Sequence, residues 1–165
     1  MINTSIPLPT EKLLEDITFE LIASKSEETR GLYLGHNEAH NLVVHRQVNL
    51  SGYSIADLIV LHKYSDKLAA TILELKNVPL SSKDINQVFR YRRALELMEI
   101  FEEINCILIG TDISDGHYIL NETTEKLNAY AFRVDAMDGL KFELLDGSFY
   151  IDVDTSAAMQ QLTNF

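Results

Sequence analysis

Apolar residues three or four positions apart predict an amphipathic helix near the start of the chain. The predicted helix covers residues 11–25, and its apolar positions are Leu13, Leu14, Ile17, Leu21 and Ile22. Thr10 directly precedes it and is a favourable N-cap residue. Glu11 and Glu15 lie near its start, where acidic side chains complement the helix dipole. We therefore expect a helix that begins after Thr10.

A second, longer helix is predicted over residues 84–103. This stretch contains no Gly or Pro, and it follows the breaks at Pro79 and Ser81-Ser82. Its helically spaced apolar residues are Ile85, Val88, Phe89, Leu95 and Met98. Twenty residues without a breaker predict one continuous helix.

Runs of apolar and β-branched residues predict strands at 42–48, 54–62, 69–77 and 105–110. The last run is almost wholly apolar, which is typical of a strand buried inside a sheet. The order strand, helix, strand around residues 84–103 predicts a parallel crossover. After residue 110 the pattern predicts a short helix at 122–128 and a meander of strands at 129–134, 140–145 and 148–153.

Length and composition favour one α/β domain. The 165 residues include 46% hydrophobic and 24% charged residues, and neither a repeat nor a linker divides them. We predict a single domain over 1–165, with a core at about 10–110 and a β extension at about 111–165. The single cysteine, Cys106, has apolar neighbours and is predicted to be a core thiol in a reducing compartment. Short apolar runs and the absence of a signal-like N-terminus predict a cytoplasmic protein without membrane spans.

The charge is strongly negative overall but locally positive. Twenty-five acidic and fourteen basic residues give a net charge of -11, which argues against a general nucleic-acid coating protein. Residues 76–93 are the exception, because five basic residues there accompany one acid, Asp84. Such a basic segment is either the solvated face of a helix or a local anion site, and the pattern alone leaves both open.

Three charged residues interrupt predicted core strands. Asp57 lies among apolar neighbours on one strand, and Glu74 and Lys76 lie on the next. A buried carboxylate costs several kcal/mol unless a cation or donors compensate it. If the two strands form a hairpin, Asp57 and Glu74 approach each other and make an oxygen site suited to Mg²⁺ or Mn²⁺. Alternation places Glu74 and Lys76 on one face with Leu75 pointing away. The alternative is an ion pair of Lys76 with either acid and no metal.

The long helix presents a polar stripe that could cover these acids. Gln87 and Tyr91 are one turn apart, and Arg90, Arg92 and Arg93 lie beside them. A phosphate backbone would be attracted by arginines and a metal ion despite the negative total charge.

At these residues the sequence resembles the PD-(D/E)XK nuclease superfamily. Asp57 followed by Glu74-Leu75-Lys76 is similar to its signature, and Gln87 to Tyr91 is similar to the Gln-x-x-x-Tyr motif of its exonuclease and NucS-like branches. Upstream, the segment from Glu11 to Glu15 resembles the opening helix of NucS-like mismatch endonucleases, and Arg46-Gln47-Val48 resembles the strand before their Asp. The resemblance covers about residues 10–110. Ala56 stands where the proline of the family name would be.

The resemblance implies a restriction-endonuclease-like fold, with the order αβββαβ and a mixed central sheet flanked by helices. It also implies metal-dependent hydrolysis of nucleic-acid phosphodiester bonds, with DNA favoured over RNA. Asp57, Glu74 and the backbone carbonyl of Leu75 would then hold Mg²⁺ or Mn²⁺, and Glu11 or Glu15 would complete the site. Lys76 would orient or deprotonate a water or stabilise the transition state, the last being the role that needs no lowered pKa.

Further roles follow from the same resemblance. Gln87 and Tyr91 would position the metal-site groups or the strand. Phosphate contacts are expected from Arg46, Lys83, Arg90, Arg92 and Arg93. A homodimer or a larger partner protein is also expected. The competing hypothesis, supported by the net charge of -11, is a catalytically silent nuclease-fold protein that acts as an oligomeric or protein-binding module.

Overall fold

The computed structural model describes residues 8–24, 41–50, 52, 54–64, 66–112, 127–135, 137 and 139–145. Its elements, in order, are α1 (Glu11–Ala23), β1 (Asn41–Asn49), β2 (Ile55–Tyr64), β3 (Lys67–Leu75), α2 (Ser82–Glu96), β4 (Glu103–Gly110), β5 (Leu127–Asp135) and β6 (Gly139–Leu144). The predicted mixed α/β class and the predicted core order αβββαβ are confirmed.

All six strands belong to one mixed sheet in the order β1-β2-β3-β4-β5-β6. The strands β1, β2 and β3 pair antiparallel, β3 pairs parallel with β4, and β4 pairs parallel with β5. The last pair, β5 and β6, is antiparallel. Helix α2 connects the parallel strands β3 and β4, which confirms the predicted crossover. The two described strands of the tail therefore extend the central sheet.

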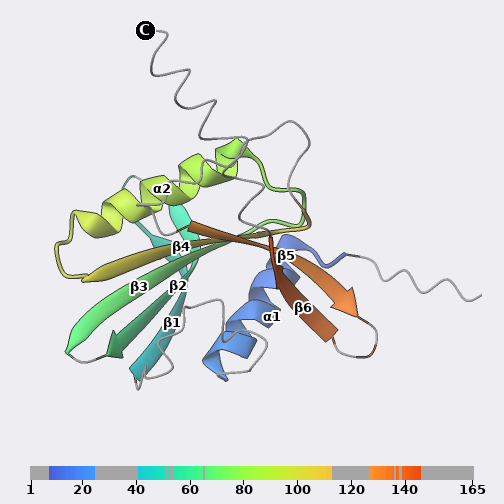
Figure 1. Ribbon diagram of the computed structural model, residues 1–165, viewed down its shortest axis with the longest axis horizontal. Helices are drawn as coiled ribbons and strands as arrows, with labels where there is room; N and C mark the ends of the chain where they lie inside the picture. The colour runs from blue at the N-terminus through green and yellow to red at the C-terminus, as the bar shows by residue number, and fades with distance from the viewer. Residues whose placement is uncertain are drawn as a thin grey trace, which may run out of the picture.

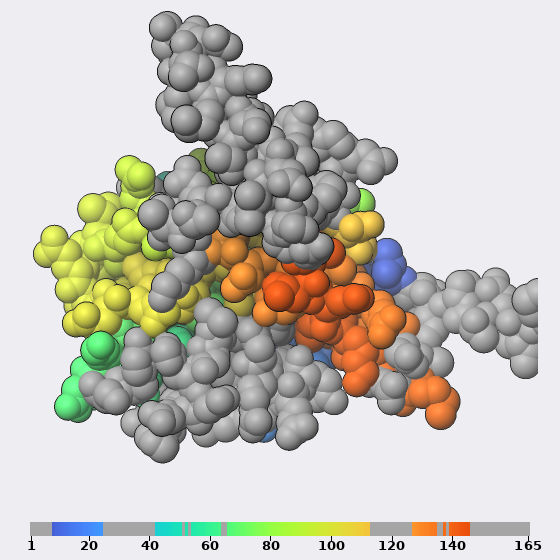
Figure 2. Space-filling model, viewed as in Figure 1, coloured from blue at the N-terminus to red at the C-terminus, as the bar shows by residue number. Residues whose placement is uncertain are grey.

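The two helices cover opposite faces of the sheet, as Figure 1 shows. We name the two layers of buried side chains by their helix. The α2-side cluster includes Ala56, Ile59, Ile72, Leu80, Ile85, Val88, Tyr91 and Cys106. The α1-side cluster includes Leu14, Ile22, Leu58, Val60, Leu73, Leu75 and Ile107. Each fully buried aliphatic side chain of this size contributes roughly 1.5–3 kcal/mol, so both layers hold the sheet. In Figure 2, α2 and the β5–β6 pair form much of the visible described surface, and little of α1 is visible.

The start of each helix follows from its cap. The Oγ1 of Thr10 accepts the N–H of Leu13 at 3.1 Å, which confirms the predicted start of α1. The α2 helix begins two residues before the predicted position, because Ser81 and Asp84 form a reciprocal capping box.

The predicted end of the second helix is wrong. The pattern extended it to residue 103, whereas α2 ends at Glu96 and Glu99 adopts a left-handed backbone with a φ of 56°. The chain must turn here, because β4 begins at Glu103 and runs parallel to β3. No Gly or Pro marks the turn, so periodicity alone continued the helix.

Most other described boundaries differ from the prediction by one or two residues, and two of these differences concern residues discussed below. The third strand ends at Leu75 and not at residue 77, although the N–H of Lys76 still donates to the carbonyl of Ile109 at 2.8 Å. The helix predicted at 122–128 is wrong at its end, since Leu127 and Asn128 belong to β5 and pair with β4. Residues 122–126 and the strand predicted at 148–153 lie outside the described residues. Within the described part of the chain, neither helix is long and apolar enough to cross a membrane.

Gly110 at the end of β4 leaves no room for a side chain. A Cβ there would lie 2.6 Å from Cγ of Leu80 and 2.9 Å from the carbonyl oxygen of Val78. We predict that Gly110→Ala lowers the free energy of unfolding by about 1–3 kcal/mol, measured by urea denaturation. In the double variant with Leu80→Ala the loss should be smaller than the sum of the two single losses. Equal stability of Gly110→Ala and wild type would contradict this packing.

Candidate active site

The pairing of β1 with β2 is interrupted at Asp57, and this interruption determines which way the Asp57 side chain points. The β1–β2 ladder pairs Arg46 with Leu58 and Val48 with Ala56 but skips the position between them, which Gln47 and Asp57 occupy. Ala56 packs in the α2-side cluster and Leu58 in the α1-side cluster, although residues two apart in a regular strand share a face. The alternation therefore breaks at Asp57.

Strands β2 and β3 form the antiparallel hairpin that the sequence analysis considered, and it brings two carboxylates together. The ladder ends at the pair Leu58–Leu73, so Asp57 and Glu74 are the next residues on the two strands. Glu74 is only 2% exposed, and Asp57 is half-buried. The Oδ2 of Asp57 accepts the N–H of Leu75 at 2.9 Å. Leu75 itself packs in the α1-side cluster.

The carboxylate of Glu74 lacks compensating charge. Burial, a hydrogen bond with Asp57 and the negative charge of Asp57 together raise the pKa of Glu74 to about 9. The positive charge of Lys76 acts in the opposite direction and lowers this pKa. At neutral pH Glu74 therefore keeps its proton, in a place where a cation would be stabilising.

This donor set fits a divalent ion held by few protein ligands. In the described part of the chain, no three His, Cys, Asp or Glu side chains lie close enough to hold a metal together. Asp57 and Glu74 contact each other and are the two carboxylates that the sequence analysis assigned to it. Mg²⁺ is commonly bound by one or two carboxylates and keeps several waters, so two acids satisfy its chemistry. The contribution of the Leu75 carbonyl stays a prediction.

Glu11 and Glu15 of α1 lie in different surroundings. Glu11 is exposed, and its Oε1 lies 3.9 Å from Nζ of Lys76. Glu15 is 4% exposed, and its Oε2 accepts from a guanidinium nitrogen of Arg46 at 2.6 Å. Its Oε1 accepts from the side-chain amide of Gln47. The structure thus brings Glu11 to the lysine and places Glu15 against β1.

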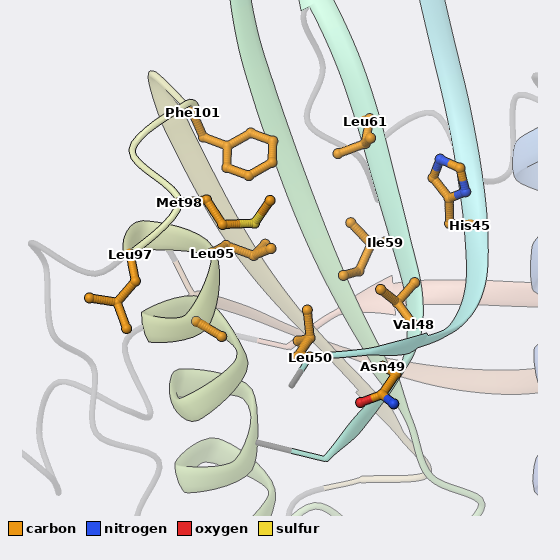
Figure 3. Close-up of a pocket in the computed structure, with 11 residues that line it drawn as sticks. His45, Val48, Asn49, Leu50, Ile59, Leu61, Leu95, Leu97, Met98 and Phe101 are labelled. Carbon is orange, nitrogen blue, oxygen red and sulfur yellow. The ribbon is translucent and has the colours of Figure 1, made fainter. Parts of the chain in front are cut away.

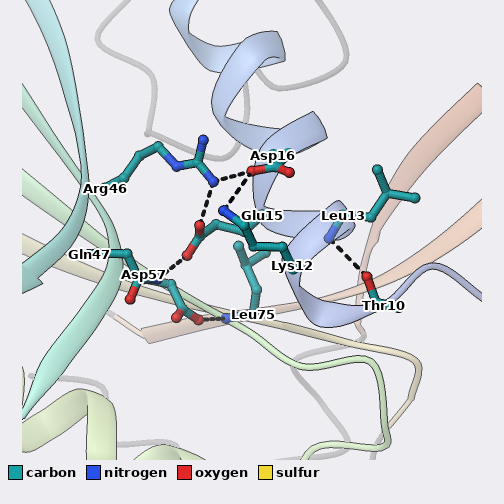
Figure 4. A network of polar contacts seen from close by, with 9 residues as sticks. All are labelled: Thr10, Lys12, Leu13, Glu15, Asp16, Arg46, Gln47, Asp57 and Leu75. Carbon is teal, nitrogen blue, oxygen red and sulfur yellow. Dashed lines mark hydrogen bonds and ion pairs between the residues drawn. The ribbon is translucent and has the colours of Figure 1, made fainter.

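Arg46 is engaged by α1. Besides Glu15 it binds Asp16, as Figure 4 shows. Its guanidinium group also lies over the ring of Phe19, with 5.1 Å to the ring centre. The hydrogen bond with Arg46 lowers the pKa of Asp16, and the hydrogen bond with Glu15 raises the pKa of Arg46. A phosphate contact by Arg46 stays a prediction and would compete with these ion pairs.

A polar hollow of about 410 Å³ opens between α1 and the irregular part of β1 and β2. It is lined by Glu11, Lys12, Glu15, Gln47 and Asp57. Figure 4 shows Glu15, Gln47 and Asp57 close together where α1 crosses the strands. The sequence prediction did not assign Gln47 to the site, although the Arg46-Gln47-Val48 segment pointed to this strand.

A larger hollow of about 500 Å³ lies between the end of α2 and the strands β1 and β2 (Figure 3). Its walls are apolar, with Leu61, Leu95, Met98 and Phe101 among them, and it contains no acidic side chain. It therefore lacks the groups that the phosphodiester chemistry needs.

Helix α2 fixes β2 near Asp57. Tyr91 is fully buried, and its hydroxyl donates to the carbonyl of Ile55 at 3.0 Å. The amide of Gln87 donates to the Tyr91 oxygen at 2.7 Å, so the predicted one-turn pair is confirmed. Burial raises the pKa of Tyr91, and the charge of Glu74 adds to this effect. The two side chains thus hold the strand two residues before Asp57.

The basic side chains of α2 differ in exposure. Lys83, Arg90 and Arg93 are exposed, whereas Arg92 donates to Glu96 at 2.8 Å. Their contact with nucleic acid stays a prediction.

Comparison with known proteins gave partial structural likeness. No family model and no curated protein matches the chain. Among solved structures, it is similar to a repair endonuclease from Pyrococcus abyssi, with 18% identity over 68% of this chain and a TM-score of 0.45. It is also similar to EndoMS in a complex with double-stranded DNA, with 18% identity over 70% of this chain and a TM-score of 0.42. The chain spans 42% of the length of each of these proteins.

The hydroxyl of Tyr91 offers a direct test of how α2 holds β2. We predict that Tyr91→Phe lowers the free energy of unfolding by about 1–2 kcal/mol, because the buried carbonyl of Ile55 loses its donor. Gln87→Met keeps that bond and should cost less. Urea denaturation measures both, and a larger loss in Gln87→Met than in Tyr91→Phe would contradict this arrangement.

The raised pKa of Glu74 makes stability depend on pH. Between about pH 4.5 and pH 9 the folded protein keeps a proton that the unfolded chain has released, so the free energy of unfolding falls as pH rises. In metal-free buffer, Glu74→Gln should remove this part of the slope, and its stability relative to wild type should rise with pH. Urea denaturation from pH 5.5 to 8.5 measures the effect, with Glu96→Gln as an exposed control. If the free energy of unfolding had the same pH dependence in Glu74→Gln and wild type, the raised pKa of Glu74 would be contradicted.

Proposed function

We propose that this chain is a metal-dependent nuclease that hydrolyses phosphodiester bonds, with DNA as its substrate. The observation that carries the proposal is the pair Asp57 and Glu74, two adjacent carboxylates with a shortage of positive charge at the end of two paired strands. Lys76 directly follows the end of β3 and acts electrostatically on Glu74. The resemblance of these residues to the PD-(D/E)XK signature supports the same reading.

In this proposal Asp57, Glu74 and the backbone carbonyl of Leu75 hold Mg²⁺ or Mn²⁺. The bound ion supplies Lewis acidity toward a phosphate oxygen and makes water more acidic. The Leu75 N–H fixes the Asp57 carboxylate through its Oδ2. Tyr91, supported by Gln87, holds the backbone of β2 and so the position of Asp57.

Lys76 stabilises negative charge on the phosphoryl group. Its ammonium group lies 3.9 Å from Glu11, a distance that leaves its three donors able to turn toward a substrate. A preorganised cation at the place where charge develops is an effective form of transition-state stabilisation. Glu11 accordingly orients the lysine, and Glu15 forms the α1 wall of the site.

DNA is favoured over RNA because of the resemblance to mismatch endonucleases. The exposed basic side chains of Lys83, Arg90 and Arg93 on α2 supply phosphate contacts. Their positive charge compensates locally for the net charge of -11. Binding should therefore weaken steeply as salt concentration rises.

A second candidate function is a nuclease-fold module that binds another protein and does not cut. Three exposed apolar side chains after the end of α2 favour it: Leu97, Met98 and Ile100, which are 68%, 53% and 52% exposed. Exposed apolar side chains that gather in one patch are a feature of protein-contact surfaces. A homodimer or larger partner and a cytoplasmic location stay predictions.

The decisive assay is cleavage of labelled DNA and RNA, single-stranded and duplex, with Mn²⁺ or Mg²⁺. We predict metal-dependent cleavage of DNA that falls at least about 100-fold in Asp57→Asn, Glu74→Gln and Lys76→Met. Glu96→Gln, an exposed acid on α2, serves as the matched control and should keep wild-type activity.

Two results would contradict the proposal. Cleavage that survives all three substitutions would show a contaminating nuclease, and a folded protein that cleaves none of these substrates would favour the protein-binding module.

Mn²⁺ should also raise the melting temperature of wild type but not of Asp57→Asn, because an ion that binds only the folded state stabilises it.

A further inference from the structure

Two consecutive side chains of β1 bind the two oxygens of one carboxylate. Arg46 donates to Oε2 of Glu15 at 2.6 Å, and the side-chain amide of Gln47 donates to Oε1. In a regular strand, consecutive side chains point to opposite faces of the sheet. Both can reach Glu15 only if the alternation breaks between them.

The backbone departs from the extended strand conformation at Gln47. Its φ is 48°, in the left-handed region that glycine adopts easily and a residue with a Cβ adopts at a cost. The strand changes face here, since Val44 packs in the α1-side cluster and Val48 in the α2-side cluster. Backbone strain of this kind is concentrated at functional sites, where surrounding contacts maintain it.

The conformation places the amide of Gln47 in the polar hollow. Gln47, Glu15 and Asp57 line the same space, and Gln47 occupies the position across from Asp57 that the ladder skips. Glu15 is 4% exposed, so its carboxylate has little freedom once both oxygens are bound. Arg46 already supplies positive charge to it. The neutral amide therefore adds direction and leaves the charge of the hollow unchanged.

We propose that Gln47 is a positioning residue of this site: its amide fixes the orientation of the Glu15 carboxylate on the wall of the hollow beside Asp57. This inference rests on the proposed nuclease function. It identifies Glu15, and not Glu11, as the acid of α1 that is held in one orientation at the site. It also explains why the backbone at position 47 is left-handed.

The test separates the side chain from the backbone. Gln47→Met keeps the length of the side chain without its donors, and Gln47→Gly keeps the left-handed backbone without the side chain. His45→Ala, an exposed residue of the same strand on the opposite side of the sheet, is the control. For each variant we would measure Mn²⁺ affinity by isothermal titration calorimetry, stability by urea denaturation, and DNA cleavage as kcat and KM.

We expect Gln47→Met and Gln47→Gly to weaken Mn²⁺ binding and to lower kcat by roughly tenfold or more, with little change in KM. Gln47→Gly should do so while remaining as stable as wild type, which a merely structural role would not produce. In a Glu15→Gln background, Gln47→Met should have no additional effect, because the glutamine acts through that carboxylate.

The failures are distinguishable. If wild type binds Mn²⁺ and cleaves DNA, but Gln47→Met and Gln47→Gly bind and cleave equally well, the inference is overturned and the proposed function stands. An effect of Gln47→Met that persists unchanged in the Glu15→Gln background also overturns it. If wild type neither binds Mn²⁺ nor cleaves, the proposed function fails and this inference fails with it.

Discussion

Two carboxylates lie side by side at one end of a buried sheet, and the arrangement of the site depends on how their charge is compensated. The antiparallel pairing of β2 and β3 forces Asp57 and Glu74 together, because the apolar residues behind them fix the register. Without a metal ion the conflict is relieved by a proton on Glu74, because burial and the neighbouring Asp57 raise its pKa to about 9. A divalent ion would relieve the same conflict and displace that proton.

The scaffold holds this unfavourable pair from both faces of the sheet. On one face, buried Tyr91 of α2 binds the β2 backbone just before Asp57. On the other, α1 is attached to β1 through Glu15, and Glu11 at its start lies near Lys76. Burial of the large apolar clusters on both faces stabilises the fold. This stabilisation offsets the free-energy cost of the strained backbone at Gln47 and of the buried acids.

Much of the architecture was predictable because it follows from local rules. Thr10 caps α1 as its residue type predicts, and the strand, helix, strand order around α2 gives a parallel crossover. The hairpin that joins Asp57 to Glu74 followed from two apolar strands interrupted by acids. The end of α2 was not predictable from the sequence. The chain makes a left-handed turn at Glu99 in order to enter β4, and no Gly or Pro in the sequence marks this turn.

The role of Gln47 was hidden for a related reason. Strand periodicity assigns Arg46 and Gln47 to opposite faces, and only the left-handed backbone brings both to Glu15. The same strand break turns Asp57 toward the hollow, so the site lies where the regular pattern fails. Positions that contradict local rules are expected at functional sites.

The most direct test of this account is to count the protons released when Mg²⁺ or Mn²⁺ binds. Isothermal titration calorimetry at pH 7.5 in buffers of different ionisation enthalpy gives that number. The account predicts release of about one proton per ion in wild type, because Glu74 is protonated without metal, and almost none in Glu74→Gln. Binding to wild type without proton release, or no binding at all, would contradict it.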